Sequence, residues 1–139
     1  LACAAVLADD SGLIVDALDG APGVYSSRYS GVDGDDSANN AKLLRELSAV
    51  PLAKRTARFA SVLVFIDEDG LETVAEGFVE GHIGLVERGK HGFGYDPLFF
   101  PDACNGEVTM AELTQSQKNA ISHRGNALRE LRKKLHPSD

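Results

Sequence analysis

Two adjacent aspartates, in the run Asp9-Asp10-Ser11-Gly12, are the first residues in the chain whose types can support chemistry. They follow an apolar stretch at residues 4–8, so we expect a strand that ends in a polar turn. Neighbouring carboxylates repel each other, and Mg²⁺, which prefers hard oxygen ligands, relieves that repulsion. One carboxylate could also orient or deprotonate a water molecule. The competing interpretation is an Asx turn in which these side chains only close the backbone.

A glycine-rich segment at residues 88–97, RGKHGFGYDP, is the second candidate. Glycines let a backbone approach a ligand closely and expose its N–H groups. Phe93 and Tyr95 offer flat faces on which a nucleobase could stack. The spacing is not the GxxxxGK[ST] pattern of a Walker A loop. The alternative is a tight connection whose aromatic side chains pack in the core.

The third candidate is the segment that begins at Thr114, which we expect to be helical and to carry cationic side chains near a helix end. Thr114 and Gln117 form a Thr-x-x-Gln capping box. In a continuous helix, Arg124 would fall inside an apolar stripe and would need an anion or a path to solvent. Alternatively, Ser122 caps a new helix whose free N–H groups attract phosphate. The stripe consists of Ile121, Leu128, Leu131 and Leu135.

Both helix geometries give an anion site. His123 and Arg124 would lie in or beside the first turn, and Lys118 would reach the same rim from the other side. The competing interpretation pairs the arginine with a structural carboxylate.

The elements that would position these groups are mixed strands and helices, which indicates an α/β or α+β fold. The run at residues 62–66 is apolar on both faces, which favours a central strand covered on two sides. Residues 57–80 are typical of a β-hairpin. We expect a helix at residues 37–48 and a further strand at residues 82–87.

Composition narrows the classes of function. With 139 residues, the chain has the length of a single domain, residues 1–139. The net charge of −7 argues against a general nucleic-acid binder, because phosphate backbones reward clustered positive charge. No apolar run approaches the roughly 18 residues of a membrane helix. The two cysteines lack metal-ligand spacing, which favours reduced thiols in the cytoplasm.

Three segments taken together resemble one family, the inosine triphosphate pyrophosphatases. They are residues 8–31 (ADDSGLIVDALDGAPGVYSSRYSG), 92–101 (GFGYDPLFFP) and 111–128 (AELTQSQKNAISHRGNAL). The resemblance implies Mg²⁺-dependent hydrolysis of ITP, dITP and XTP to the monophosphate and pyrophosphate. It also implies a mixed central sheet flanked by helices, two lobes with the substrate cleft between them, and a homodimer.

Site residues follow from the same resemblance. Asp10 would be the general base and a metal-linked carboxylate, with Asp9 beside it at the metal, and Ser11 would touch the substrate. The nucleoside pocket would be lined by Phe93, Gly94, Tyr95 and Asp96. Base or phosphate groups would contact Lys118, His123 and Arg124.

In the family, a strand and a phosphate loop of Ser/Thr-x-Asn-x-x-Lys type come before the acidic motif, and residues 1–8 (LACAAVLA) do not contain that loop. We therefore expect a member that lacks its N-terminal segment. The alternative function is a non-catalytic nucleotide-binding or dimerisation fragment. A third option is a pyrophosphatase for modified pyrimidine nucleotides.

Overall fold

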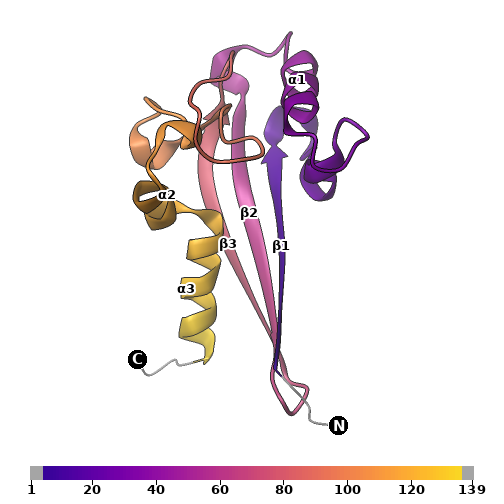
Figure 1. Cartoon of the computed structure of the whole chain (residues 1–139), viewed down its shortest axis with the longest axis vertical. Coiled ribbons are helices and arrows are strands. Elements are labelled where there is room, and N and C mark those ends of the chain that lie inside the picture. The colour runs from indigo at the N-terminus through magenta and orange to yellow at the C-terminus, as the bar shows by residue number, and fades with distance from the viewer. Residues whose placement is uncertain (1–4, 136–139) are drawn as a thin grey trace.

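Four strands form one sheet in the computed structural model, which describes residues 5–135 (Figure 1). The order is β1-β2-β3-β4, and each neighbouring pair is antiparallel. The expected α/β fold is confirmed, while the described strands contain no parallel pair of the kind that a mixed sheet requires. The strands are β1 (Val6–Val15), β2 (Thr56–Ile66), β3 (Glu72–Ile83) and β4 (Phe99–Pro101).

Three α-helices accompany the sheet: α1 (Asp36–Glu46), α2 (Gln115–Ile121) and α3 (His123–Leu135). The predicted helix at residues 37–48 corresponds to α1, whose N-cap Asp35 accepts a hydrogen bond from the Ala38 amide. Figure 1 shows α1 and α2 on opposite sides of one end of the sheet, with α3 running along its length. No described helix is long and apolar enough to cross a membrane.

The turn predicted at residues 9–12 is wrong, because these residues lie within β1. The strand is uninterrupted, and Asp9 pairs with Leu63 while Gly12 pairs with Ala60. Because β2 is long enough to pair with all of β1, the ladder satisfies backbone groups that a turn would otherwise close. The expected start of the strand at residue 4 lies outside the described residues. Successive side chains alternate between the two faces of the sheet, which separates Asp9 from Asp10.

One face of the sheet carries the core, and β2 shows this by alternation. Ala57, Phe59, Ser61 and Leu63 are buried, whereas the residues between them are only half-buried. The expectation that β2 is covered on both faces is therefore wrong for the described residues. On the open face, Val74 and Phe78 of β3 are 38% and 43% exposed.

The predicted hairpin at residues 57–80 is confirmed as β2 and β3. The further strand expected at residues 82–87 is wrong, because His82 and Ile83 complete β3 and the chain then leaves the sheet. The amide of Gly84 instead donates to the carbonyl of Leu98. Residues 84–98 thus form a long irregular loop that returns to β4.

α3 begins anew at its own cap rather than continuing α2. The Ser122 hydroxyl accepts a hydrogen bond from the Gly125 amide at 3.0 Å, as the second of the two helix geometries predicts. The restart changes which residues face the sheet: Ala127 and Leu131 are buried, and Leu128 and Leu135 of the expected stripe are exposed. The capping box of Thr114 and Gln117 at the start of α2 is confirmed.

Candidate functional site

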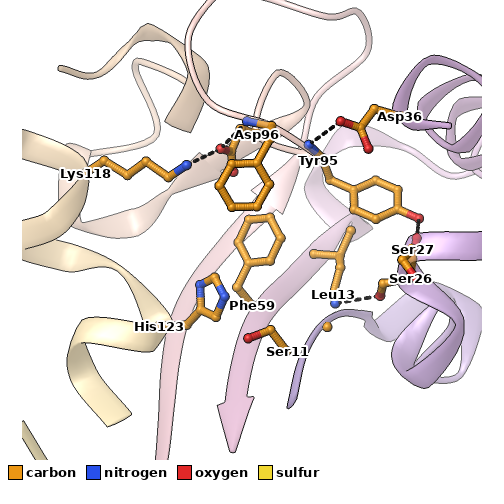
Figure 2. A pocket seen from close by; sticks show the side chains of 13 residues that line it. Ser11, Leu13, Ser26, Ser27, Asp36, Phe59, Tyr95, Asp96, Lys118 and His123 are labelled. Carbon is orange, nitrogen blue, oxygen red and sulfur yellow. Dashed lines mark hydrogen bonds and ion pairs between the residues drawn. The ribbon is translucent and has the colours of Figure 1, made fainter. Parts of the chain in front are cut away.

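A cavity of about 190 Å³ lies on the covered face of the sheet, at the end that carries α1 and α2. Figure 2 shows Lys118 and His123 on one side of it and Ser26, Ser27 and Asp36 on the other. Drug-sized ligands usually occupy pockets of about 300 Å³ or more, so this cavity has room for part of such a molecule, such as a nucleobase.

Tyr95 and Ser26 build one wall of the cavity. The Tyr95 hydroxyl donates to the Ser26 carbonyl at 2.5 Å, and the Ser26 hydroxyl accepts from the Leu13 amide at 2.9 Å. Burial raises the pKa of the Tyr95 phenol, so this group stays protonated and keeps its donor. These bonds join the glycine-rich loop to the loop that follows β1.

Asp96 and Lys118 form a buried ion pair at 2.5 Å. The same carboxylate oxygen, Oδ2, also accepts from the Phe93 amide at 3.0 Å. Lys118 Nζ lies 4.3 Å from the centre of the Phe93 ring, in cation–π geometry. Phe93 itself is 68% exposed, so one face of its ring is available to a flat ligand.

His123 is the neutral polar group of the cavity. Its ring stacks on Phe59 with centroids 5.1 Å apart, and its Nδ1 atom is buried without a hydrogen-bond partner in the described structure. Burial, together with the neighbouring Arg124, lowers the pKa of His123 to about 4. At neutral pH the imidazole therefore offers one donor and one acceptor.

Asp9 lies on the same face as the cavity and is held by three partners. Its Oδ2 atom contacts Arg124 Nε at 2.6 Å, and its Oδ1 atom accepts from the Ser61 and Ser11 hydroxyls at 3.1 and 3.2 Å. Arg124 thus has a carboxylate partner, as the competing interpretation of this arginine foresaw. The pair lies at the rim of the cavity, with the arginine side chain 56% exposed.

Of the other predicted site residues, Asp10 shares a hollow only with its neighbour Ser11. Its side chain points to the open face of the sheet, where it borders a shallower hollow with Val24, Ala60 and Val62. Strand alternation causes this separation, because Asp9 and Asp10 are neighbours in an unbroken strand. The cavity itself collects Ser11, Phe93, Gly94, Tyr95, Asp96, Lys118 and His123.

The described residues do not form a complete metal site. No group of three or more His, Cys, Asp or Glu side chains converges among residues 5–135. Asp9 is the member of the acidic pair that faces the site, and it is already paired with Arg124. Mg²⁺ is commonly held by one or two carboxylates together with substrate phosphates, so the chain would supply only part of its coordination.

Several further residues contribute to the site without having been predicted, among them Ser26, Ser27, Asp36, Phe59 and Ser61. Ser61 is the one polar residue within an otherwise apolar run, residues 60–66, and this was a usable signal. From the sequence, Asp36 is predicted only to lie at the N-terminus of a helix. Its carboxylate in fact accepts a hydrogen bond from the Gly94 amide at 2.9 Å.

Comparison with known proteins places the chain in a family. The profile of the Ham1 family matches residues 2–134. The chain belongs to the Ham1 family. A dITP/XTP pyrophosphatase of Exiguobacterium sibiricum is 55% identical over 127 residues, which are 91% of this chain and 63% of that protein. One from Oceanobacillus iheyensis is 53% identical over 133 residues, or 95% of this chain and 66% of that protein.

Solved Ham1 structures share the fold. The Staphylococcus aureus Ham1 protein matches with a TM-score of 0.90 and 42% identity, covering 99% of this chain and 69% of that one. These matches confirm the resemblance drawn from the three sequence segments. The chain spans less than two thirds of the length of the curated relatives described above.

Proposed function

We propose that this Ham1-family chain takes part in the hydrolysis of non-standard purine nucleoside triphosphates, ITP, dITP and XTP, to the monophosphate and pyrophosphate. The observation that carries the proposal is the cavity in which Phe93, Asp96, Lys118 and His123, from separate segments, converge. The names of the relatives from Exiguobacterium and Oceanobacillus support the same substrate class.

Base selection follows from the hydrogen-bonding groups of the cavity. A 6-oxopurine presents an acceptor at O6, whereas adenine presents an amino donor there. Lys118 has three N–H donors and gives one to Asp96, so the others remain for O6. Adenine would leave these buried donors unpaired, and mismatches of that kind discriminate strongly between substrates. Phe93 supplies the stacking face for the base.

The reaction itself needs an oriented water molecule and a neutralised triphosphate. The family resemblance assigns the general base to Asp10, and that assignment stays a prediction. The geometry favours Asp9 as the carboxylate nearer the cavity, with Arg124 beside it as a cation for the phosphates. Mg²⁺, when bound with the substrate, would supply charge neutralisation at the phosphates.

A homodimer and a cytoplasmic setting are part of the proposal. The exposed apolar side chains Val74 and Phe78 on the open face of the sheet would favour burial against a second copy. Free nucleoside triphosphates, the proposed substrates, are a cytoplasmic pool.

The test measures pyrophosphate release from ITP, dITP and XTP, with dATP as the poor substrate. If Asp10 is the base, Asp10→Asn lowers kcat by roughly 10²–10⁴, the usual contribution of general-base catalysis. Asp9→Asn, which removes the partner of Arg124, should mainly raise KM. Asp33→Asn, on an exposed loop, is the matched control.

Two results would change the account. A wild-type chain that releases no pyrophosphate from any of these substrates contradicts the proposed activity. Normal turnover in Asp10→Asn together with a large kcat loss in Asp9→Asn would transfer the base role to Asp9.

A further inference from the structure

Two adjacent asparagines of α1, Asn39 and Asn40, are each 2% exposed. A buried amide is costly unless its donors and acceptor are bonded. Leu43 and Leu47, one and two turns later, show that α1 otherwise buries apolar side chains against the core. The two amides therefore occupy positions where apolar residues would serve core packing better.

Asn39 holds one wall of the cavity. Its Nδ2 atom donates to the Ser27 carbonyl at 3.0 Å, and its Oδ1 atom accepts from the Ser30 amide at 2.8 Å. Ser27 lines the cavity, and its neighbour Ser26 accepts the Tyr95 hydroxyl. Asn39 thus fixes the loop after β1 at two points beside the site.

Asn40 holds a second wall, which is the turn at Gly94. Its Nδ2 atom donates to the Gly94 carbonyl at 3.0 Å, and Asp36, one helical turn earlier, accepts from the Gly94 amide at 2.9 Å. Both backbone polar groups of Gly94 are therefore held by α1. Gly94 has φ of +60°, a conformation that favours glycine, and it lies between Phe93 and Tyr95.

The Oδ1 atom of Asn40 has no hydrogen-bond partner in the described structure. The polar contacts of this buried amide are therefore made by its donor. The donor reaches the glycine-rich loop at Gly94 and, at 3.3 Å, the carboxylate of Glu87 just before that loop.

We propose that Asn39 and Asn40 are positioning residues that set the separation of the two walls of the nucleotide site. Asn39 fixes the wall at Ser27, and Asn40 fixes the wall that carries Phe93 and Asp96. Recognition of a base in the cavity depends on that separation, because misplacements of about 1 Å weaken a positioned site strongly. This inference rests on the proposed function.

The experiment replaces each amide by the isosteric acid. Asn40→Asp and Asn39→Asp remove the NH₂ donor and keep the size of the side chain. Ala41→Asp adds the same negative charge to an exposed position of the same helix and is the control. Hydrogen exchange is followed for residues 92–97 and 23–31, and binding of ITP and ATP by calorimetry.

We expect Asn40→Asp to speed exchange at residues 92–97 and Asn39→Asp at residues 23–31. We expect Asn40→Asp also to raise the Kd for ITP about tenfold or more and to reduce the preference for ITP over ATP. Ala41→Asp should resemble wild type in both measurements.

Unchanged exchange in both walls overturns the inference. Faster exchange with wild-type affinity and wild-type preference for ITP also overturns it, because the asparagines would then act on structure alone. A wild-type chain that binds neither nucleotide contradicts the proposed function instead, and the exchange measurement still decides whether each asparagine holds its wall.

Discussion

At the scale of single residues, the charged groups of the site neutralise one another. Asp96 pairs with Lys118 inside the cavity, and Asp9 pairs with Arg124 at its rim. His123 is neutral because burial disfavours its cation. Under the proposed function, an incoming base would meet a pre-arranged set of donors and acceptors, which lowers the cost of ordering them on binding.

His123 gives a prediction for pH dependence. Its pKa is about 4 in the folded chain, below the ordinary value of 6.5, so the unfolded chain binds more protons between these pH values. The contribution of His123 to stability is complete above about pH 6.5 and is lost as the pH falls through 4. Site-specific NMR titration should find its midpoint near pH 4.

The control for this titration is His123→Gln, which cannot titrate and should show a weaker loss of stability between pH 6.5 and 4. A measured His123 midpoint at or above 6.5 would contradict the buried, neutral imidazole. The groups whose charges act on this histidine are Arg124, Asp96, Asp9 and Lys118.

Residue types revealed most of the cavity before its geometry was known. Phe93, Tyr95, Lys118 and His123 stand out because aromatic and basic groups cluster beside glycines and a helix cap, and the family resemblance added Asp96. The face on which Asp9 or Asp10 lies was not predictable, because side-chain direction depends on strand register with residues some fifty positions away.

At the scale of elements, the start of α3 is positioned by a close approach to β3. A Cβ atom at Gly77 would overlap the backbone nitrogen of Ala127 and the carbonyl oxygen of His123. Glycine at this position lets the first turn of α3 sit against the sheet, and that turn carries His123 and Arg124 to the cavity and its rim.

Gly77→Ala should therefore displace α3. Because the overlapping atoms are backbone, we expect the free energy of unfolding to fall by about 1–3 kcal/mol or more, as in overpacked cores. Urea denaturation measures this, with Glu76→Ala, an exposed neighbour on β3, as the control. An unfolding midpoint equal to that of wild type would contradict the close packing of α3 on β3.

The sequence predicted helix ends well where the stabilising hydrogen bonds join residues only a few positions apart. The capping box of Thr114 and Gln117 is a short-range hydrogen-bond pattern, and it is present. The polar run at residues 9–12 gave a wrong prediction of a turn because the residues that stabilise it are distant in the sequence. Ser61 and Arg124 stabilise Asp9 inside a strand. Tertiary contacts override local turn propensity there.

At the scale of the whole molecule, the chain is acidic, yet two cations, each paired with a carboxylate, lie at the proposed nucleotide site. The net charge is −7, whereas Lys118 and Arg124 lie in and beside the cavity. Fold class and family could be predicted from the sequence, because three motifs in a fixed order are highly specific. The open face of the sheet could not be predicted, since apolar residues such as Val62 and Val64 are of the types that are usually buried.

The central claim is that the cavity selects a 6-oxopurine nucleotide through donors at Lys118. Calorimetric titration of the chain with ITP and with ATP tests it directly, with Lys118→Met as the variant that keeps the side-chain length and removes the donors. The account predicts that ITP binds at least about tenfold more tightly than ATP, a difference of about 1.4 kcal/mol, and that Lys118→Met abolishes the difference. Equal affinities of the wild-type chain for the two nucleotides, or no binding of ITP, would contradict it.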